Sequence, residues 1–109
     1  MKVVPMKRVN IIGDETVQYR LVGEIHNLGA SGYTYYLVHG AGTKGGVRPR
    51  HGEPGNTKIE VVCTADLAEQ ILQHLADHYL GNYAMIAFVD DVAVVGSQQF
   101  VIQRDALRN

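Results

Sequence analysis

The stretch YTYYLVHGAGTKGGVRPRHGEPGNTKIEVVC, residues 33–63, decides the fold. Its two ends, 33–38 and 58–63, are rich in aromatic and β-branched residues, which is typical of strands. Between these ends lie six glycines and two prolines, with almost no apolar residues. Loops longer than about 12–15 residues without structure of their own are usually functional or disordered. The stretch therefore predicts two strands joined by a long loop, about residues 40–57, that is either functional or a simple surface connection.

Length and composition describe one domain, residues 1–109, with 46% hydrophobic and 19% charged residues. Ten Lys and Arg stand against 11 Asp and Glu, so charge gives no general case for a nucleic-acid partner. The sequence has no run of 18 apolar residues, and its charged start lacks the apolar core of a signal peptide. We therefore expect a cytoplasmic protein. The lone Cys63 lies in an apolar run, which predicts a buried, inert thiol.

Two amphipathic segments predict helices. Asp14 is a candidate N-cap for the first helix, and Gly29 is the kind of residue that ends one. The second helix is expected to begin at Thr64 or Asp66 and to stop at Gly81–Asn82. Apolar residues recur at helical spacing at Val17, Leu21, Ile25 and Leu28, and again at Leu67, Ile71, Leu72, Leu75 and Tyr79.

Strands are further expected at 6–12, 84–89, 92–95 and 100–102, with a turn at Asp90–Asp91. The order strand–helix–strand–loop–strand–helix–strand is that of a ferredoxin-like α+β sandwich. In such a fold the helices cover one face of the sheet. Because residues 33–38 place apolar side chains on both faces, we expect the open face to pack against another subunit in a closed oligomer.

The start of the long loop has the glycine spacing of a dinucleotide-binding fingerprint, at residues 40–45. That fingerprint requires a helix directly after it, which the following glycines and prolines prevent. The P-loop pattern fails as well, because Thr43–Lys44 has the reverse order. Glycine backbones can nevertheless approach a phosphate closely. Positive charge is supplied by Lys44, Arg48 and Arg50. The loop therefore predicts an anion site at its base, with a solvent-exposed connection as the alternative.

Other candidate sites are weaker. His74 and His78 have the i, i+4 spacing of two metal ligands, but no third ligand is evident, and a solvent-exposed helix face is the simpler interpretation. Asp90–Asp91 could form an acid pair, although a turn explains it better. The sequence contains no recognisable pairing of a nucleophile with a base, so we expect no enzymatic activity.

Three short motifs follow one another along the chain: Gly-Tyr-Thr at 32–34, His-Gly-Ala-Gly at 39–42 and Thr-Lys-Ile-Glu-Val-Val at 57–62. Together they resemble the PII signalling superfamily. Their order and spacing agree with the family over roughly residues 6–95. The Ser-Gly-Tyr-Thr segment, the Gly-x-Gly-Thr-Lys loop opening and the Gly-Glu-Pro-Gly turn look most like PII-like proteins associated with bicarbonate transporters and carboxysomes.

The resemblance implies a homotrimer that binds an adenine nucleotide in the clefts between subunits. The long loop, called the T-loop in this family, would report occupancy to a protein target such as a bicarbonate transporter or a carboxysome-related protein. By position, Thr34 would meet the adenine edge, strand residues 60–62 would lie along adenine and ribose, and loop residues 40–48 would hold the phosphates. The implied nucleotide-binding residues are Thr34, Gly40, Ala41, Gly42, Thr43, Lys44, Arg48, Glu60, Val61 and Val62.

The sequence also departs from the nitrogen-sensing members. Residues 40–57 contain neither the tyrosine that those members modify nor any serine. Lys44 stands where they use a glutamine to help hold Mg-ATP with 2-oxoglutarate. Their phosphate-binding loop and their last-strand arginines are replaced by 80–85 and 94–96. This loss of positive charge favours ADP or AMP as ligand, with room for bicarbonate. A divalent-metal-tolerance trimer and a nitrogen-sensing PII protein are the alternatives.

Overall fold

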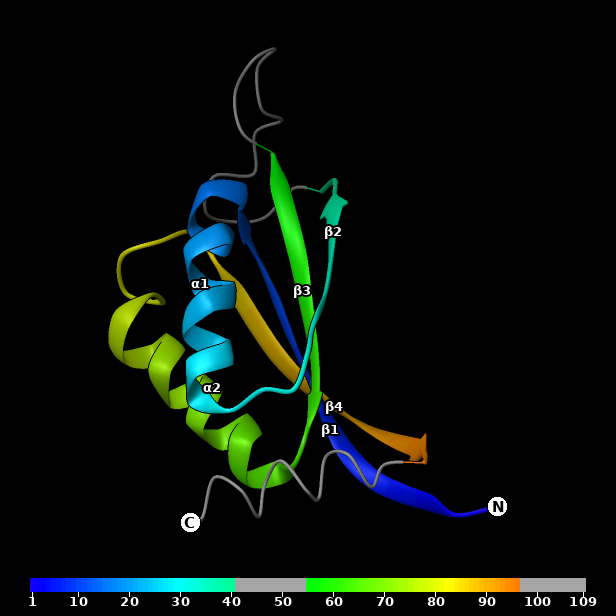
Figure 1. Cartoon of the computed structure of the whole chain (residues 1–109). Helices are drawn as coiled ribbons and strands as arrows, with labels where there is room; N and C mark the ends of the chain where they lie inside the picture. Colours follow the sequence, from blue (N-terminus) through cyan, green and yellow to red (C-terminus); the bar gives the residue numbers. More distant parts are fainter. Residues whose placement is uncertain (41–54, 97–109) are drawn as a thin grey trace.

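The computed structural model describes residues 1–40 and 55–96. Its elements are β1 (Val3–Asp14), α1 (Glu15–Leu28), β2 (Thr34–Val38), β3 (Asn56–Cys63), α2 (Ala65–His78) and β4 (Ile86–Val95) (Figure 1). This order confirms the expected βαββαβ fold. The strand expected at 100–102 and most of the loop at 40–57 lie outside the described residues.

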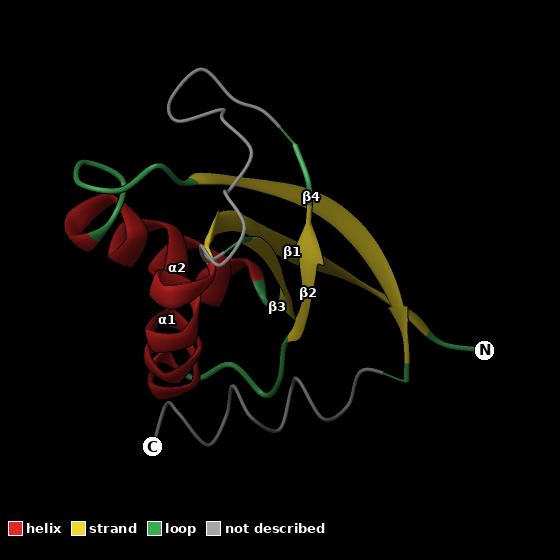
Figure 2. Cartoon of the chain, turned by 90° about the horizontal axis from the view of Figure 1, so that it is seen from above, coloured by secondary structure: helices red, strands yellow, loops and turns green. Residues whose placement is uncertain are grey.

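The strands form one antiparallel sheet in the order β2-β3-β1-β4. Both helices lie on the same side of this sheet, as Figure 2 shows. The other face carries no helix in the described part of the chain, and we call it the open face. The ferredoxin-like arrangement predicted from the sequence is thus confirmed, with one covered and one open face.

The two helices are capped by side chains that the sequence pointed to. The Asp14 carboxylate accepts a hydrogen bond of 2.8 Å from the backbone N–H of Thr16 at the start of α1. Gly29 ends α1 with φ 120°, a conformation that favours glycine. Of the two candidate caps for α2, Thr64 is the N-cap, and its hydroxyl accepts from the N–H of Leu67 at 3.2 Å. α2 ends at His78, before the expected stop at Gly81–Asn82.

The core lies between the helices and the covered face. It is built mainly from aliphatic side chains of alternate strand positions and of the helical stripes: Val9, Ile11, Leu21, Ile25, Ile59, Val61, Ile71 and Leu75. Cys63 is buried at its edge, and burial raises the pKa of its thiol to about 11, so the expectation of a buried thiol is confirmed. Gln18, also fully buried, donates to the carbonyl oxygens of Ile11 at 2.8 Å and Thr57 at 3.1 Å, which ties α1 to both central strands.

The turn expected at Asp90–Asp91 is wrong, because both residues lie inside the continuous strand β4. They stand opposite Arg8 and Lys7 of β1, and each carboxylate pairs with the cation across from it. Opposite charges on neighbouring strands stabilise a sheet and allow two aspartates in a strand that local propensity disfavours. Because each aspartate is paired with a cation, Asp90 and Asp91 do not form the acid pair that was the alternative to a turn.

β1 and β4 continue together past the end of β3. The pairing of β3 with β1 begins at Lys7, whereas β4 pairs with β1 from Val3 onward. Val3–Met6 and Val92–Val95 therefore form a two-stranded extension, which we call the β1–β4 ribbon, and Figure 1 shows it projecting beside the N-terminus. No helix among the described residues is long and apolar enough to cross a membrane.

Candidate functional site

The described members of the expected site lie along the β2–β3 pairing, with Thr34 and Glu60 at one end and Gly40 beyond the other. Thr34 opens β2, is exposed, and stands directly opposite Glu60. Gly40 follows β2 at the root of the loop and is exposed as well. The remaining expected loop residues lie outside the described part of the chain: Ala41, Gly42, Thr43, Lys44 and Arg48. The structure therefore brings Thr34 and Glu60 together and leaves the phosphate contacts a prediction.

β3 extends beyond its partner at this point. Its pairing with β2 stops at the Thr34–Glu60 pair, and the register gives the three following residues, Val61–Cys63, partners only on β1. A strand edge without a neighbouring strand offers backbone donors and acceptors to a ligand. The expected contacts of Val61 and Val62 with a nucleotide fit such an edge.

Val61 and Val62 differ in what they can offer. The side chain of Val61 is fully buried in the core, so only its backbone could meet a ligand. Val62 points to the open face and is partly exposed. Because side chains alternate along a strand, one of the two must lie inside. For Val61, the predicted contact with a nucleotide is therefore limited to its backbone atoms.

Glu60 is held by two neighbours on the open face. The hydroxyl of Tyr36 donates to Glu60 Oε2 at 2.6 Å, and Lys58 Nζ lies 3.2 Å from the same oxygen. These contacts lower the pKa of the Glu60 carboxyl, the Tyr36 hydrogen bond most of all, against an opposing effect of burial. Lys58 Nζ also lies 5.9 Å from the ring centre of Tyr36 and 5.5 Å from that of Phe88. The carboxylate is therefore ionised and fixed in direction.

The sequence reasoning missed Tyr36 and Lys58 as partners of Glu60. A signal was present, since Lys58 and Glu60 are two residues apart in a strand and must share a face. Tyr36 and Thr34 on β2 are likewise two residues apart and must share a face. What the sequence could not supply is the register, which sets Tyr36 opposite Lys58.

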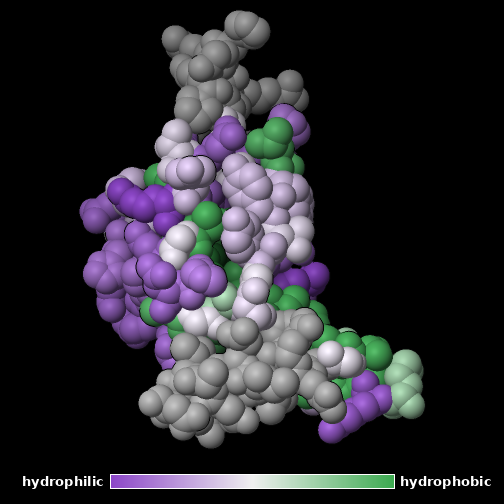
Figure 3. All heavy atoms as spheres, viewed as in Figure 1, coloured by the Kyte–Doolittle hydropathy of each residue, from purple (hydrophilic) through white to green (hydrophobic). Residues whose placement is uncertain are grey.

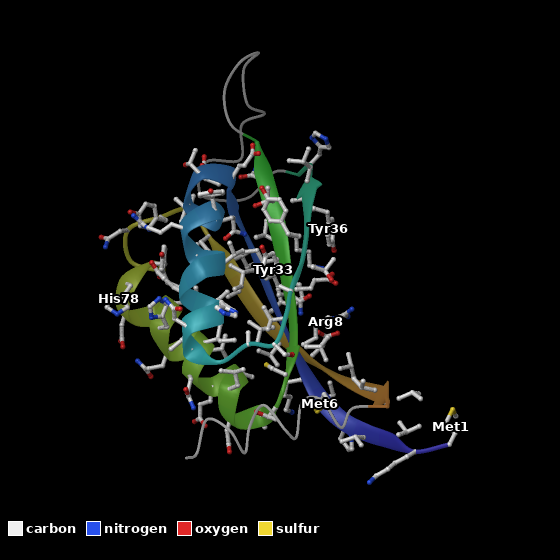
Figure 4. The ribbon with its side chains drawn as sticks, in the orientation of Figure 1. Met1, Met6, Arg8, Tyr33, Tyr36 and His78 are labelled. Atoms are coloured by element: carbon white, nitrogen blue, oxygen red, sulfur yellow. The ribbon has the colours of Figure 1, made fainter. Side chains whose placement is uncertain are left out.

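A second charged group occupies the open face on β1 and β4. Arg8 Nε donates to Asp90 Oδ1 at 3.0 Å, and its Nη2 pairs with Asp90 Oδ2. The side-chain amide of Asn10 donates to Asp90 Oδ1 at 2.8 Å. These hydrogen bonds, that of Arg8 first, lower the pKa of Asp90 to about 2. Figure 4 shows Arg8 and Tyr36 on the same side of the sheet.

Large apolar side chains surround these charged groups. Tyr36, Ile86 and Phe88 lie on the open face and remain exposed in the single chain. Their register places them in two adjacent rows, Tyr36–Lys58–Ile12–Ile86 and Thr34–Glu60–Asn10–Phe88. Exposed large apolar side chains that lie together on one face are typical of a surface that a protein partner covers.

His74 does not lie on a solvent-exposed helix face as expected. Its Nε2 lies 2.6 Å from Glu24 Oε1 of α1, and the hydroxyl of Tyr79 donates to the same oxygen at 2.8 Å. Burial would raise the pKa of Glu24, but the hydrogen bonds with His74 and Tyr79 outweigh it, and the pKa is lowered. Within residues 1–40 and 55–96, no three His, Cys, Asp or Glu side chains are grouped to hold a metal ion. His74 thus joins the two helices.

Comparison with known proteins identifies the family. The sequence profile of the nitrogen regulatory protein P-II family matches residues 6–99. A comparison with functionally curated proteins gives no match.

Three solved structures resemble the chain. A PII-like signalling protein of Thermus thermophilus is 35% identical, with a TM-score of 0.77 over 92% of this chain and 99% of that one. CPII of Thiomonas intermedia K12, bound to ADP and bicarbonate, is 20% identical, with a TM-score of 0.80 over 91% of this chain and 97% of that one. The GlnK–ATP complex of B. subtilis is 19% identical, with a TM-score of 0.55 over 81% of this chain and 82% of that one. With its profile, fold and a relative at 35% identity in agreement, the chain belongs to the PII family.

Proposed function

We propose that this protein is a homotrimeric, non-enzymatic regulator that binds ADP or AMP in the clefts between its subunits. Bicarbonate is the second ligand of the proposal. The loop at 40–57 reports occupancy to a protein target in inorganic-carbon uptake or carboxysome-based carbon fixation. The observation that carries the proposal is the Thr34–Glu60 pair beside the unpaired end of β3, because the strand residues expected to contact adenine are neighbours there.

The choice of ligand is supported by a protein of the same fold. CPII of Thiomonas intermedia K12 has been solved with ADP and bicarbonate, and with ADP, AMP and bicarbonate. Its TM-scores of 0.80 and 0.81 to this chain show a shared fold. At 20% identity the ligands themselves remain part of the proposal.

Charge supports a ligand with fewer than three phosphates. The last strand ends in Val94 and Val95, where the nitrogen-sensing members would carry arginines. A triphosphate carries more negative charge than a diphosphate or monophosphate, so it gains more from cations in the cleft. Without those cations, ATP loses the advantage that its third phosphate would give.

The trimer is supported by the open face of the sheet. That face exposes Tyr36, Ile86 and Phe88 around the ion pair of Arg8 with Asp90. Leaving such side chains in water forgoes about 25 cal/mol for every Å² of apolar surface that a neighbour could cover. A cyclic assembly covers the same face in each copy.

Titration calorimetry with AMP, ADP, ATP and adenosine, each with and without bicarbonate, tests the proposal. We expect ADP or AMP to bind more tightly than adenosine and at least as tightly as ATP, at one site for each subunit, and we expect bicarbonate to change the affinity. Light scattering on the same samples should give three subunits. No binding of any adenine nucleotide to a trimer would refute the ligand assignment.

A further inference from the structure

Five side chains form a hydrogen-bonded cluster between α1, the end of α2 and the segment 80–85. We call this cluster the clasp; its members are Arg20, Glu24, His74, Tyr79 and Tyr83. Arg20 Nε donates to the Tyr79 hydroxyl at 3.2 Å, and Arg20 Nη2 donates to the Tyr83 hydroxyl at 3.3 Å. The guanidinium carbon lies 5.3 Å and 5.9 Å from the centres of the same two rings. Through Tyr83, Arg20 therefore ties the segment to α1.

The segment 80–85 reaches the root of the long loop. Its last residue, Met85, packs over Gly13 of β1, and its methyl carbon lies 3.5 Å from the position that a Cβ would take at Gly13. Gly13 stands opposite Thr57, the second residue of β3 after the long loop. The clasp therefore holds a segment that connects the helices with the base of the loop.

Glu24 lies between His74 and Arg20 in the clasp. Its Oε1 lies 2.6 Å from His74 Nε2 and accepts from the Tyr79 hydroxyl at 2.8 Å. Its Oε2 lies 3.9 Å from Arg20 Nε, which is too far for a hydrogen bond but close enough for attraction between charges. Arg20 thus has two alternative partners, the tyrosine hydroxyls that it contacts and the carboxylate one helical turn away.

The charge of His74 decides between these two partners. Histidine is the side chain that ordinarily changes charge between pH 5 and 8. A charged imidazole beside Glu24 compensates the carboxylate, so Arg20 gains little by leaving the tyrosines. Beside a neutral imidazole the carboxylate keeps its full charge, and Arg20 is the cation next to it.

The surroundings of His74 allow it to exchange protons with solvent. The side chains of His74 and Glu24 are 20% and 33% exposed, and Figure 3 shows hydrophilic residues over the helices at the left of the molecule. Within α2, the His78 ring lies 4.8 Å from that of His74, and Asp77 accepts a hydrogen bond from Gln73 at 2.8 Å. From the sheet, Lys7 is paired with Asp91 and stands opposite Cys63, at the other end of α2.

We propose that a proton on His74 controls how firmly the segment 80–85 is held to α1. A charged His74 compensates Glu24 and leaves Arg20 on the two tyrosines. When His74 gives its proton to solvent, Arg20 moves towards Glu24 and Tyr83 is released. The clasp is therefore closed at mildly acidic pH and opens as the pH rises through the titration of His74. It needs neither a nucleotide nor a second subunit, so it stands apart from the proposed function.

NMR titration of the ligand-free protein between pH 5 and 8.5 tests the clasp. The ring signals of Tyr83 should shift with the same midpoint as those of His74. His74→Gln keeps a side-chain N–H donor but cannot take up a proton, and it should abolish the Tyr83 shift. Glu24→Gln removes the charge that attracts Arg20, so it should abolish the Tyr83 shift although His74 still titrates. His78→Gln is the matched control and should keep the Tyr83 shift.

Amide hydrogen exchange gives a second measurement of the same event. The N–H of Tyr83 donates to the Tyr79 carbonyl oxygen at 3.0 Å, so its protection reports on the segment. After correction for the intrinsic pH dependence of exchange, this protection should fall about two- to five-fold between pH 6 and pH 8, the size expected for a partly exposed ion pair. It should stay constant in His74→Gln and in Glu24→Gln.

The outcomes are distinct. A Tyr83 shift that persists in Glu24→Gln, or whose midpoint differs from that of His74 in the parent, overturns the clasp. Constant protection of the Tyr83 amide in the parent overturns it as well. Circular dichroism checks that each variant is folded, and Glu24→Gln decides alone if His74→Gln does not fold. A common midpoint, its loss in both glutamine variants of the clasp and its retention in His78→Gln establish the proposal, whether or not the protein binds a nucleotide.

Discussion

Replacing Tyr36 with phenylalanine removes a single hydroxyl from the open face and leaves the ring in place. That hydroxyl donates to Glu60 Oε2 at 2.6 Å, the distance of a charge-assisted hydrogen bond. Hydrogen bonds to charged groups contribute about 1.5–3 kcal/mol, whereas exposed ion pairs contribute about 0.2–1 kcal/mol. Tyr36 is 40% exposed and the Glu60 side chain is 20% exposed, which puts this contact between the two cases. We expect Tyr36→Phe to lower the free energy of unfolding by about 1 kcal/mol at neutral pH.

The effect should depend on pH in one direction. The pKa of Glu60 is lower in the folded chain than in the unfolded one, mainly because of the Tyr36 hydrogen bond. The stabilisation is therefore present above the unfolded pKa of about 4.3 and is lost as the pH falls through the folded pKa. The difference between the parent and Tyr36→Phe should thus be full at neutral pH and should shrink at strongly acidic pH.

Tyr35→Phe provides the matched control. Tyr35 is the adjacent residue with nearly the same exposure, 41%, on the opposite face of β2, away from Glu60. Urea unfolding of the three proteins at equal concentration measures the stability, and carboxyl NMR shifts measure the pKa of Glu60. If Tyr36→Phe leaves the pKa of Glu60 unchanged, or if Tyr35→Phe lowers stability equally at neutral pH, the assignment of this hydrogen bond is refuted.

Three further predictions concern the loop and the core. Arg48→Ala should weaken ADP binding about 10- to 150-fold in calorimetry, because a charge-assisted hydrogen bond to phosphate is lost. Arg50→Ala, the control, should change the binding free energy by well under about 1 kcal/mol. Equal ADP affinities in both variants and the parent would exclude a phosphate site at the base of the loop. Gln18→Leu removes the donors to two buried carbonyl groups and should lower the free energy of unfolding by about 1–3 kcal/mol. Gln73→Leu, on the exposed face of α2, is the control and should change the free energy of unfolding by about 0.5 kcal/mol or less. Equal urea midpoints for the two variants would contradict a structural role of the Gln18 hydrogen bonds. Cys63, whose pKa is raised to about 11 by burial, should react with iodoacetamide at mildly alkaline pH only in urea, and rapid alkylation of the native protein would show that it is accessible.

Local patterns in the sequence predicted most of the fold. The helical stripes and caps required no knowledge of distant residues, and α1 starts after Asp14 and stops before Gly29 as expected. Asp90–Asp91 was misread as a turn because its partners, Arg8 and Lys7, lie more than 80 residues away in the sequence. Strand register, which decides such pairings, is set by tertiary contacts.

The candidate site was predictable only in part for the same reason. Thr34 and Glu60 were expected from a family resemblance, and the structure sets them opposite each other. The contact of Tyr36 with Glu60 required the β2–β3 register, and the link of His74 to Glu24 required the packing of α1 against α2. Neither the strand register nor the packing of the helices can be read from composition or periodicity.

The pairing of β2 with β3 ends at Val38 and Asn56, and this makes the stability of the fold nearly independent of the length of the loop between them. These two residues stand opposite each other, and Gly55 is held by a hydrogen bond of 2.9 Å from the N–H of Glu15 to its carbonyl oxygen. The entropy of closing a flexible loop grows only logarithmically, by about 0.6 kcal/mol for each doubling of its length. The length of the loop can therefore change at little cost to the stability of the fold. In the proposed function, a change in the loop beyond Arg48 would alter which target protein is recognised, while the residues expected to bind the nucleotide would stay the same.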